Sequence, residues 1–212
     1  IAQCRFAYVQ GEKLQVKENQ AWKIYRGESL MSQLYGPEEE STCFVVAWNK
    51  LYRKDLFDGI RYPEGRVHED EATTYRLFHA GKKLVFLDRA RYGYYTGNTG
   101  SITAVFSRKR LDWMTAHEER IRFFTDHGYE NLLPAAYRKL CDACITFYFR
   151  CTEDVENAKI LQADLKKRLR KYQREGAEFI CKLSWRTRIG YCLFRISPGV
   201  YRKILSRIQE PG

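Results

Sequence analysis

The spacing of hydrophobic positions changes near residue 105 of this chain. Before that point, short apolar runs alternate with turns, which is typical of a mixed α/β segment. The runs that predict strands lie at residues 1–9, within 14–24, at 44–48 and at 84–87. Helical spacing appears at residues 29–34 and 69–79, and Gly36 and Gly81 predict the ends of these two helices.

After residue 105 the apolar residues recur at helical intervals. We expect helices at residues 107–125, 134–151 and 155–173. Pro134 suits the first turn of a helix, and Gly128 and Gly176 mark breaks. The pattern therefore predicts an α/β segment over residues 1–104 followed by an α-helical extension over residues 105–212.

The acidic run His68-Glu69-Asp70-Glu71 stands at the start of the helix predicted at residues 69–79. It follows a turn, Tyr62-Pro63-Glu64-Gly65. Free backbone N–H groups and the positive end of the helix dipole favour carboxylates at such a position. Taken alone, the run is typical of a charged first helical turn.

The motifs around this run change its interpretation. Trp48-Asn49-Lys50 lies upstream, and a tyrosine-rich stretch, Tyr92-Gly93-Tyr94-Tyr95, predicted as a hairpin, precedes Gly100-Ser101-Ile102-Thr103. This order resembles the acceptor-binding half of family 2 glycosyltransferases, which have the GT-A fold. The resemblance implies a partial GT-A domain without its nucleotide-binding half. It also implies inverting sugar transfer from a nucleotide-sugar to a glycan or lipid-linked acceptor.

The resemblance assigns roles to individual residues. Asp70 is expected to be the base that deprotonates the acceptor hydroxyl, and Glu69 is its neighbour at the acceptor. The residues expected to bind the acceptor are Trp48, Asn49, Lys50, Tyr94 and Ser101. A core tryptophan is an equally good interpretation of Trp48. Many relatives carry an arginine after the tyrosine cluster, where this chain has Tyr95-Thr96-Gly97.

The metal motif of the family is absent from the sequence. GT-A enzymes hold Mn²⁺ or Mg²⁺ at an Asp-x-Asp motif to bind the donor diphosphate, and no Asp-x-Asp occurs here. We therefore expect this chain alone not to transfer sugar. The seven cysteines form neither a disulfide framework nor a zinc motif, and free thiols in this number indicate a reducing cytosol.

Positive charge is concentrated near the C-terminus. Residues 159–210 contain 14 Lys and Arg against 4 Asp and Glu, so they carry +10 of the formal net charge of +11. Within residues 184–212, arginines alternate with apolar side chains that could enter a lipid headgroup layer, namely Trp185, Tyr191, Leu193, Phe194, Ile196, Tyr201, Ile204 and Leu205. This pattern predicts a cytoplasmic protein that rests on the anionic inner face of a membrane, with a solvated basic face as the alternative.

Two further functions fit parts of the sequence. A non-catalytic glycan- or membrane-binding module would explain an acceptor motif without metal ligands. A nucleic-acid-binding protein would explain the basic C-terminal region and the pI near 9.3, although no nucleic-acid-binding module is recognised. Steep salt dependence of nucleic-acid retention would be its signature.

Overall fold

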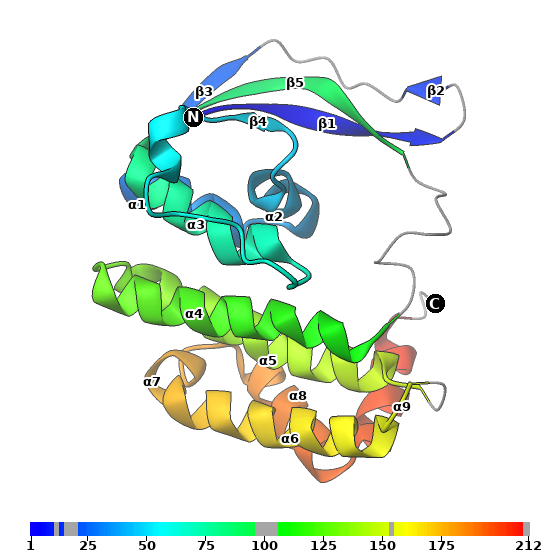
Figure 1. The fold of residues 1–212 in the computed structure, drawn as a ribbon. Coiled ribbons are helices and arrows are strands. Elements are labelled where there is room, and N and C mark those ends of the chain that lie inside the picture. The colour runs from blue at the N-terminus through cyan, green and yellow to red at the C-terminus, as the bar shows by residue number, and fades with distance from the viewer. Residues whose placement is uncertain (11–12, 15–20, 96–105, 153–154, 210–212) are drawn as a thin grey trace. The chain divides into compact units, whose positions relative to one another are not determined.

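A computed structural model gives the fold of residues 1–10, 13–14, 21–95, 106–152 and 155–209 (Figure 1). The chain forms two compact units. The first contains residues 1–105 and 109–123, and the second contains residues 106–108 and 124–212. Residues 109–123 thus group with the first unit. The boundary after residue 104 stays a prediction. The mixed α/β class followed by helices is confirmed.

The first unit contains a small mixed sheet. Its strand order is β2-β1-β5-β3, and a short β4 pairs with β1. The central strands β1 and β5 run parallel, and the other pairs are antiparallel. The strands are β1 (Ala2–Gln10), β2 (Lys13–Leu14), β3 (Trp22–Arg26), β4 (Lys50–Leu51) and β5 (Lys83–Tyr95).

Helices cover one face of this sheet (Figure 1). They lie in the long connection between β1 and β5, as a parallel strand pair requires. Phe44 stacks on Phe86 of β5 with ring centroids 5.3 Å apart, and Leu34, Tyr75 and Leu84 are fully buried in the same core. The elements are α1 (Gly27–Met31), η1 (Ser32–Tyr35), α2 (Glu38–Val45), η2 (Lys54–Phe57) and α3 (Glu69–Gly81).

The opposite face of the sheet leaves large apolar side chains in solvent. Tyr25 of β3 contacts Phe44 and Phe86 on the covered side. Alternation along a strand places Trp22 and Ile24 on the other side, where they are 64% and 54% exposed.

The predicted strand at residues 44–48 is wrong, because Phe44 and Val45 end helix α2. Pro37 precedes this helix, and three glutamates, Glu38, Glu39 and Glu40, fill its first turn, where they suit the helix dipole. An apolar run of this length fits a buried strand or a buried helix end equally well, so the run by itself does not distinguish the two.

The tyrosine-rich stretch is not a hairpin within the described residues. Tyr92, Tyr94 and Tyr95 continue β5, and they pair in parallel with β1 as far as Val9 opposite Tyr95. The predicted helix at residues 69–79 is confirmed as α3. Its left-handed C-terminal residue is Lys82, at φ 53°, and Gly81 lies inside the helix. A Cβ at Gly81 would lie 3.0 Å from Ile1 Cδ1, so glycine allows a close approach of the Ile1 side chain here.

The three predicted C-terminal helices are confirmed as α4 (Asp112–Asp126), α5 (Leu133–Arg150) and α6 (Ala158–Glu175). Between α4 and α5 lies η4 (Glu130–Leu132), and η3 (Arg108–Leu111) precedes α4. The chain continues through α7 (Ala177–Ile180), α8 (Trp185–Ile196) and α9 (Pro198–Gln209). The core of the second unit includes Leu140 and Cys144 of α5, Leu165 and Leu169 of α6, and Phe194 of α8. None of the described helices is long and apolar enough to cross a bilayer.

Candidate functional site

The acidic run at the start of α3 divides into three carboxylates with different surroundings. Glu69 is exposed, Asp70 is half-buried and Glu71 is buried. The chain enters the helix through His68, whose backbone is left-handed at φ 60° and ψ 41°. A non-glycine residue in this region is strained by about 1–3 kcal/mol, and such strain concentrates at functional sites.

Asp70 has the properties of a carboxylate prepared for proton transfer. Its Oδ1 accepts a hydrogen bond from the backbone N–H of Glu71 at 2.8 Å. The pKa of Asp70 is raised to about 6, mainly by burial and also by the charges of Glu71 and Glu69, whereas the hydrogen bond from the Glu71 N–H and the charge of Lys50 act in the opposite direction. A carboxylate with a pKa near neutrality is a stronger base than an exposed aspartate and is still mostly ionised at pH 7.

Two tyrosines lie within electrostatic range of Asp70. Burial is the main cause of the raised pKa of the Tyr52 and Tyr62 phenols, and the charge of Asp70 contributes to both. Both phenols therefore stay protonated at neutral pH and can donate hydrogen bonds.

Lys50 points into the protein. Its Nζ donates to the carbonyl oxygens of Cys43 at 3.0 Å and Val46 at 2.5 Å, and to Asn49 Oδ1 at 2.8 Å. These bonds use all three donors of an ammonium group. Burial lowers the pKa of Lys50 to about 7, while the nearby Cys43 and Asp70 act in the opposite direction. Lys50 therefore carries its positive charge near the candidate base only in part at neutral pH, and fully at lower pH.

Asn49 is also directed inward. Its Nδ2 donates to the backbone carbonyls of Cys4 and Cys43, both at 2.9 Å, which ties β1 to the end of α2. Acceptor binding by Asn49 and Lys50 stays a prediction. It requires these internal bonds to be exchanged for bonds to a sugar.

Trp48 turns away from this polar pair and joins an aromatic cluster that includes Phe6, Tyr8, Tyr92 and Tyr94. Its ring stacks on Tyr92 with centroids 4.3 Å apart and on Tyr94 with centroids 5.3 Å apart. Phe6 meets the Trp48 ring edge-on at 4.9 Å. Tyr8 is 49% exposed and Tyr92 is 39% exposed, so the cluster reaches solvent. Trp48 itself is half-buried, so acceptor binding by its ring stays a prediction.

Glu71 is the anchor that holds this end of α3 to α4. Arg120, fully buried, donates through Nη2 to the Glu71 carboxylate and to the Glu71 carbonyl at 2.7 Å. Trp113 Nε1 donates to Glu71 Oε1 at 3.0 Å, and His117 Nε2 lies 3.2 Å from Glu71 Oε2.

Sequence reasoning missed this contact. The available signal was the spacing of Trp113, His117 and Arg120, which places three hydrogen-bonding side chains on one face of a helix.

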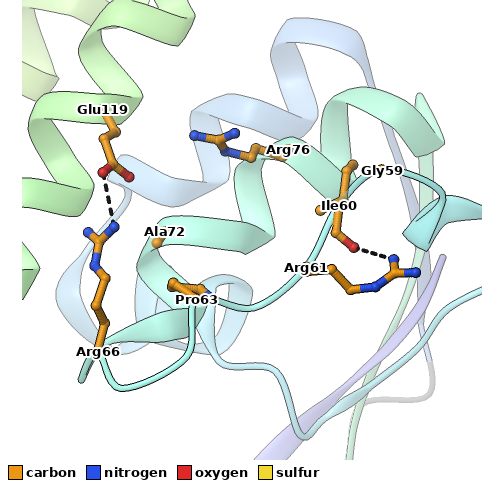
Figure 2. Close-up of a pocket in the computed structure, with 8 residues that line it drawn as sticks. All are labelled: Gly59, Ile60, Arg61, Pro63, Arg66, Ala72, Arg76 and Glu119. Atoms are coloured by element: carbon orange, nitrogen blue, oxygen red, sulfur yellow. Dashed lines mark hydrogen bonds and ion pairs between the residues drawn. The ribbon is translucent and has the colours of Figure 1, made fainter.

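A pocket of about 270 Å³ lies beside α3 on the same unit (Figure 2). Each of its arginines already has a partner. Arg66 Nη1 bonds Glu119 Oε1 at 3.0 Å, Arg61 donates to the Ile60 carbonyl at 2.8 Å, and Arg76 donates to the Tyr75 hydroxyl at 3.0 Å. Figure 2 shows the three guanidinium groups well separated, so the pocket does not present a single anion site. Asp70 is not among its lining residues.

The remaining sequence expectations concern Ser101 and the metal. Ser101 lies outside the described residues. Among the residues that the structure does describe, no group of three or more His, Cys, Asp or Glu side chains could hold a metal ion. The resemblance implies Mn²⁺ or Mg²⁺ in the complete enzyme, with ligands outside this chain, and this cation stays a prediction.

Comparison with known proteins gives two relatives. Over 127 residues the chain is 30% identical to "Glycosyltransferase GlyA" of Streptococcus pneumoniae serotype 4, a match covering 58% of this chain and 18% of that protein. Over 100 residues it is 32% identical to "Glycosyltransferase GlyG" of the same organism, covering 39% of this chain and 33% of that protein. The chain is similar to glycosyltransferases. It spans only a minor part of either relative, and no family model matches it.

Proposed function

We propose that this chain forms the acceptor side of an inverting glycosyltransferase of the family 2 type, with the GT-A fold and with Asp70 as the general base. The observation that carries the proposal is the half-buried Asp70 carboxylate at the start of α3, whose pKa is about 6. Similarity to two proteins named glycosyltransferases supports glycosyl transfer as the general activity.

In the proposed reaction, Asp70 takes the proton from an acceptor hydroxyl while that oxygen attacks the anomeric carbon of the donor sugar. The new glycosidic bond forms as the bond to the nucleoside diphosphate breaks, and the diphosphate leaves with the electron pair. With a pKa of about 6, Asp70 is mostly ionised at neutral pH, and the charge of Lys50 opposes the rise in this pKa to a small extent. Glu69, exposed beside it, is available to accept a hydrogen bond from the acceptor.

Substitution of Asp70 tests its role. In sugar transfer assays on the protein expressed from its complete reading frame, Asp70→Asn should lower turnover about a hundredfold or more, the range for loss of a general base. In the unsubstituted protein, activity should rise as pH increases through about 6, because the carboxylate must be ionised to accept a proton. Asp58→Asn is the matched control, because Asp58 is an exposed aspartate of the same unit. Normal turnover of Asp70→Asn would show that the acidic run is only a charged helix start.

The donor side is tested separately. We expect calorimetry of the 212-residue chain with UDP-sugars and Mn²⁺ to show no binding, because the sequence contains no Asp-x-Asp motif and the described residues contain no group of three or more potential metal ligands. Micromolar affinity for a nucleotide-sugar would overturn this part of the proposal and leave the Asp70 test unaffected.

The aromatic cluster supports a second candidate, a glycan-binding module without turnover. Tyr8 and Tyr92 expose ring surface next to Trp48, and aromatic rings provide flat apolar faces that suit sugar rings. In this case Trp48→Ala should abolish glycan binding while Asp70→Asn leaves it intact. Glycan array binding of both variants, together with the turnover assay, distinguishes the two functions.

A further inference from the structure

Helix α8 has one buried and one exposed apolar face. Tyr191 and Phe194, which the sequence pattern placed among the lipid-facing residues, are 2% and 0% exposed. The Tyr191 hydroxyl bonds Asp142 Oδ1 at 2.7 Å, and the Phe194 ring packs edge-on against Tyr148 with centroids 5.0 Å apart. These contacts hold α8 against α5 within the second unit, so Tyr191 and Phe194 are not available to a membrane.

The exposed face carries a different set of apolar residues. Trp185, Ile189 and Ile196 are 64%, 55% and 82% exposed, and Cys192 is exposed as well. At about 100° per residue, these four positions fall within roughly 60° of arc around the helix axis. They form one stripe along the helix, which we call the α8 stripe.

Arginines border the α8 stripe on both sides. By the same helical spacing, Arg186 lies on one side, and Arg188 and Arg195 lie on the other. Two of them bond to neighbouring segments: Arg188 Nη1 donates to the Cys181 carbonyl at 3.0 Å, and Arg195 Nη1 donates to Gln173 Oε1 of α6 at 3.3 Å. The Arg186 guanidinium lies 5.5 Å from the centroid of the Trp185 ring. Neither α8 nor the following α9 contains Asp or Glu.

We propose that the α8 stripe seats the protein on an anionic lipid surface, an interaction independent of the proposed Asp70 chemistry. The apolar residues would enter the headgroup layer while the flanking arginines meet anionic lipid, as in interfacial amphipathic helices. Two other occupants fit less well. A second copy would bring the same arginines together across a two-fold axis, and nucleic acid phosphates would gain nothing from an apolar stripe.

Vesicle sedimentation of the 212-residue chain tests the proposal. The chain should sediment with phosphatidylcholine vesicles that contain about one third phosphatidylglycerol, and not with phosphatidylcholine alone, because arginines select anionic lipid. The double variant Trp185→Ser/Ile189→Ser should weaken this binding about tenfold or more, the change expected for losing large buried apolar side chains.

The exposed face of the sheet supplies a closely matched control. Trp22 and Ile24 are 64% and 54% exposed, nearly the same as Trp185 and Ile189. The variant Trp22→Ser/Ile24→Ser should therefore bind vesicles normally if the α8 stripe is the contact. Equal losses in both variants would overturn the proposal. RNA retention and self-association of both variants are measured without vesicles. The proposal is also overturned if either property depends on the α8 stripe while vesicle binding does not.

Thiol labelling locates the contact directly. Cys192 lies within the stripe and Cys181 precedes α8, and both thiols are exposed. Bound anionic vesicles should slow maleimide labelling of Cys192 more than labelling of Cys181, with Cys192→Ser identifying the signal. Unchanged labelling of Cys192 on vesicle-bound protein would show that another surface makes the contact.

Discussion

Replacing Asp70 by asparagine should stabilise the first unit at neutral pH, although we expect it to lower turnover about a hundredfold or more. Burial raises the pKa of Asp70 from 3.8 to about 6, so the folded state binds this proton more tightly than the unfolded state. Ionisation of Asp70 therefore costs folding free energy. The cost is absent below the unfolded pKa, grows as pH rises between 3.8 and about 6, and is complete at pH 7.

The magnitude follows from this shift. Roughly two pKa units at about 1.4 kcal/mol each give an upper limit near 3 kcal/mol. Asp70 keeps part of its surface in water, which reduces this value. Removing a carboxylate from a helix N-terminus also costs about 0.3–1 kcal/mol. We therefore expect Asp70→Asn to raise the free energy of unfolding by about 1–2 kcal/mol at pH 7, and by much less at pH 4.

Urea denaturation followed by tryptophan fluorescence measures this difference. Trp22, Trp48 and Trp113 lie in the first unit, and the fourth tryptophan, Trp185, lies in the second, so the signal reports mainly the unit that contains Asp70. Glu69→Gln removes the same charge from an exposed neighbour and should lower stability slightly at both pH values. An Asp70→Asn variant that is less stable at pH 7, or whose difference does not change with pH, would refute the reasoning.

Two other predictions concern packing. Arg120→Met leaves the buried Glu71 carboxylate without its main counter-charge and should cost about 3–5 kcal/mol in a denaturation experiment, whereas adding Glu71→Gln should recover part of this loss. Gly176→Ala would place a Cβ 2.5 Å from Tyr137 Cγ and should cost about 1–3 kcal/mol. Gly199→Ala on α9, where a Cβ meets nothing within 4 Å, should be neutral or stabilise by up to about 1 kcal/mol, and equal melting temperatures for the two alanine variants would contradict the packing.

The sequence alone determined the long helices and the placement of Asp70. Apolar residues recurring every three to four positions predicted α3, α4, α5 and α6, because this spacing creates a hydrophobic stripe only in a helix. The acidic residues after the turn at Tyr62-Pro63-Glu64-Gly65 placed Asp70 in a first helical turn, since local backbone groups favour carboxylates there.

Tertiary structure decided the features that depend on residues far apart in the chain. The run at residues 44–48 has no diagnostic period, so its helical state was fixed by how α2 packs on the sheet. Glu71 and Asp70 are neighbours in the sequence but have different surroundings. Glu71 forms an ion pair with Arg120, which is 49 positions away in the chain, whereas burial raises the pKa of Asp70. Likewise, periodicity marked α8 as amphipathic, but only packing against α5 showed that Tyr191 faces inward and Ile189 outward. Burial depends on which surfaces meet, and a pattern within one segment does not contain that information.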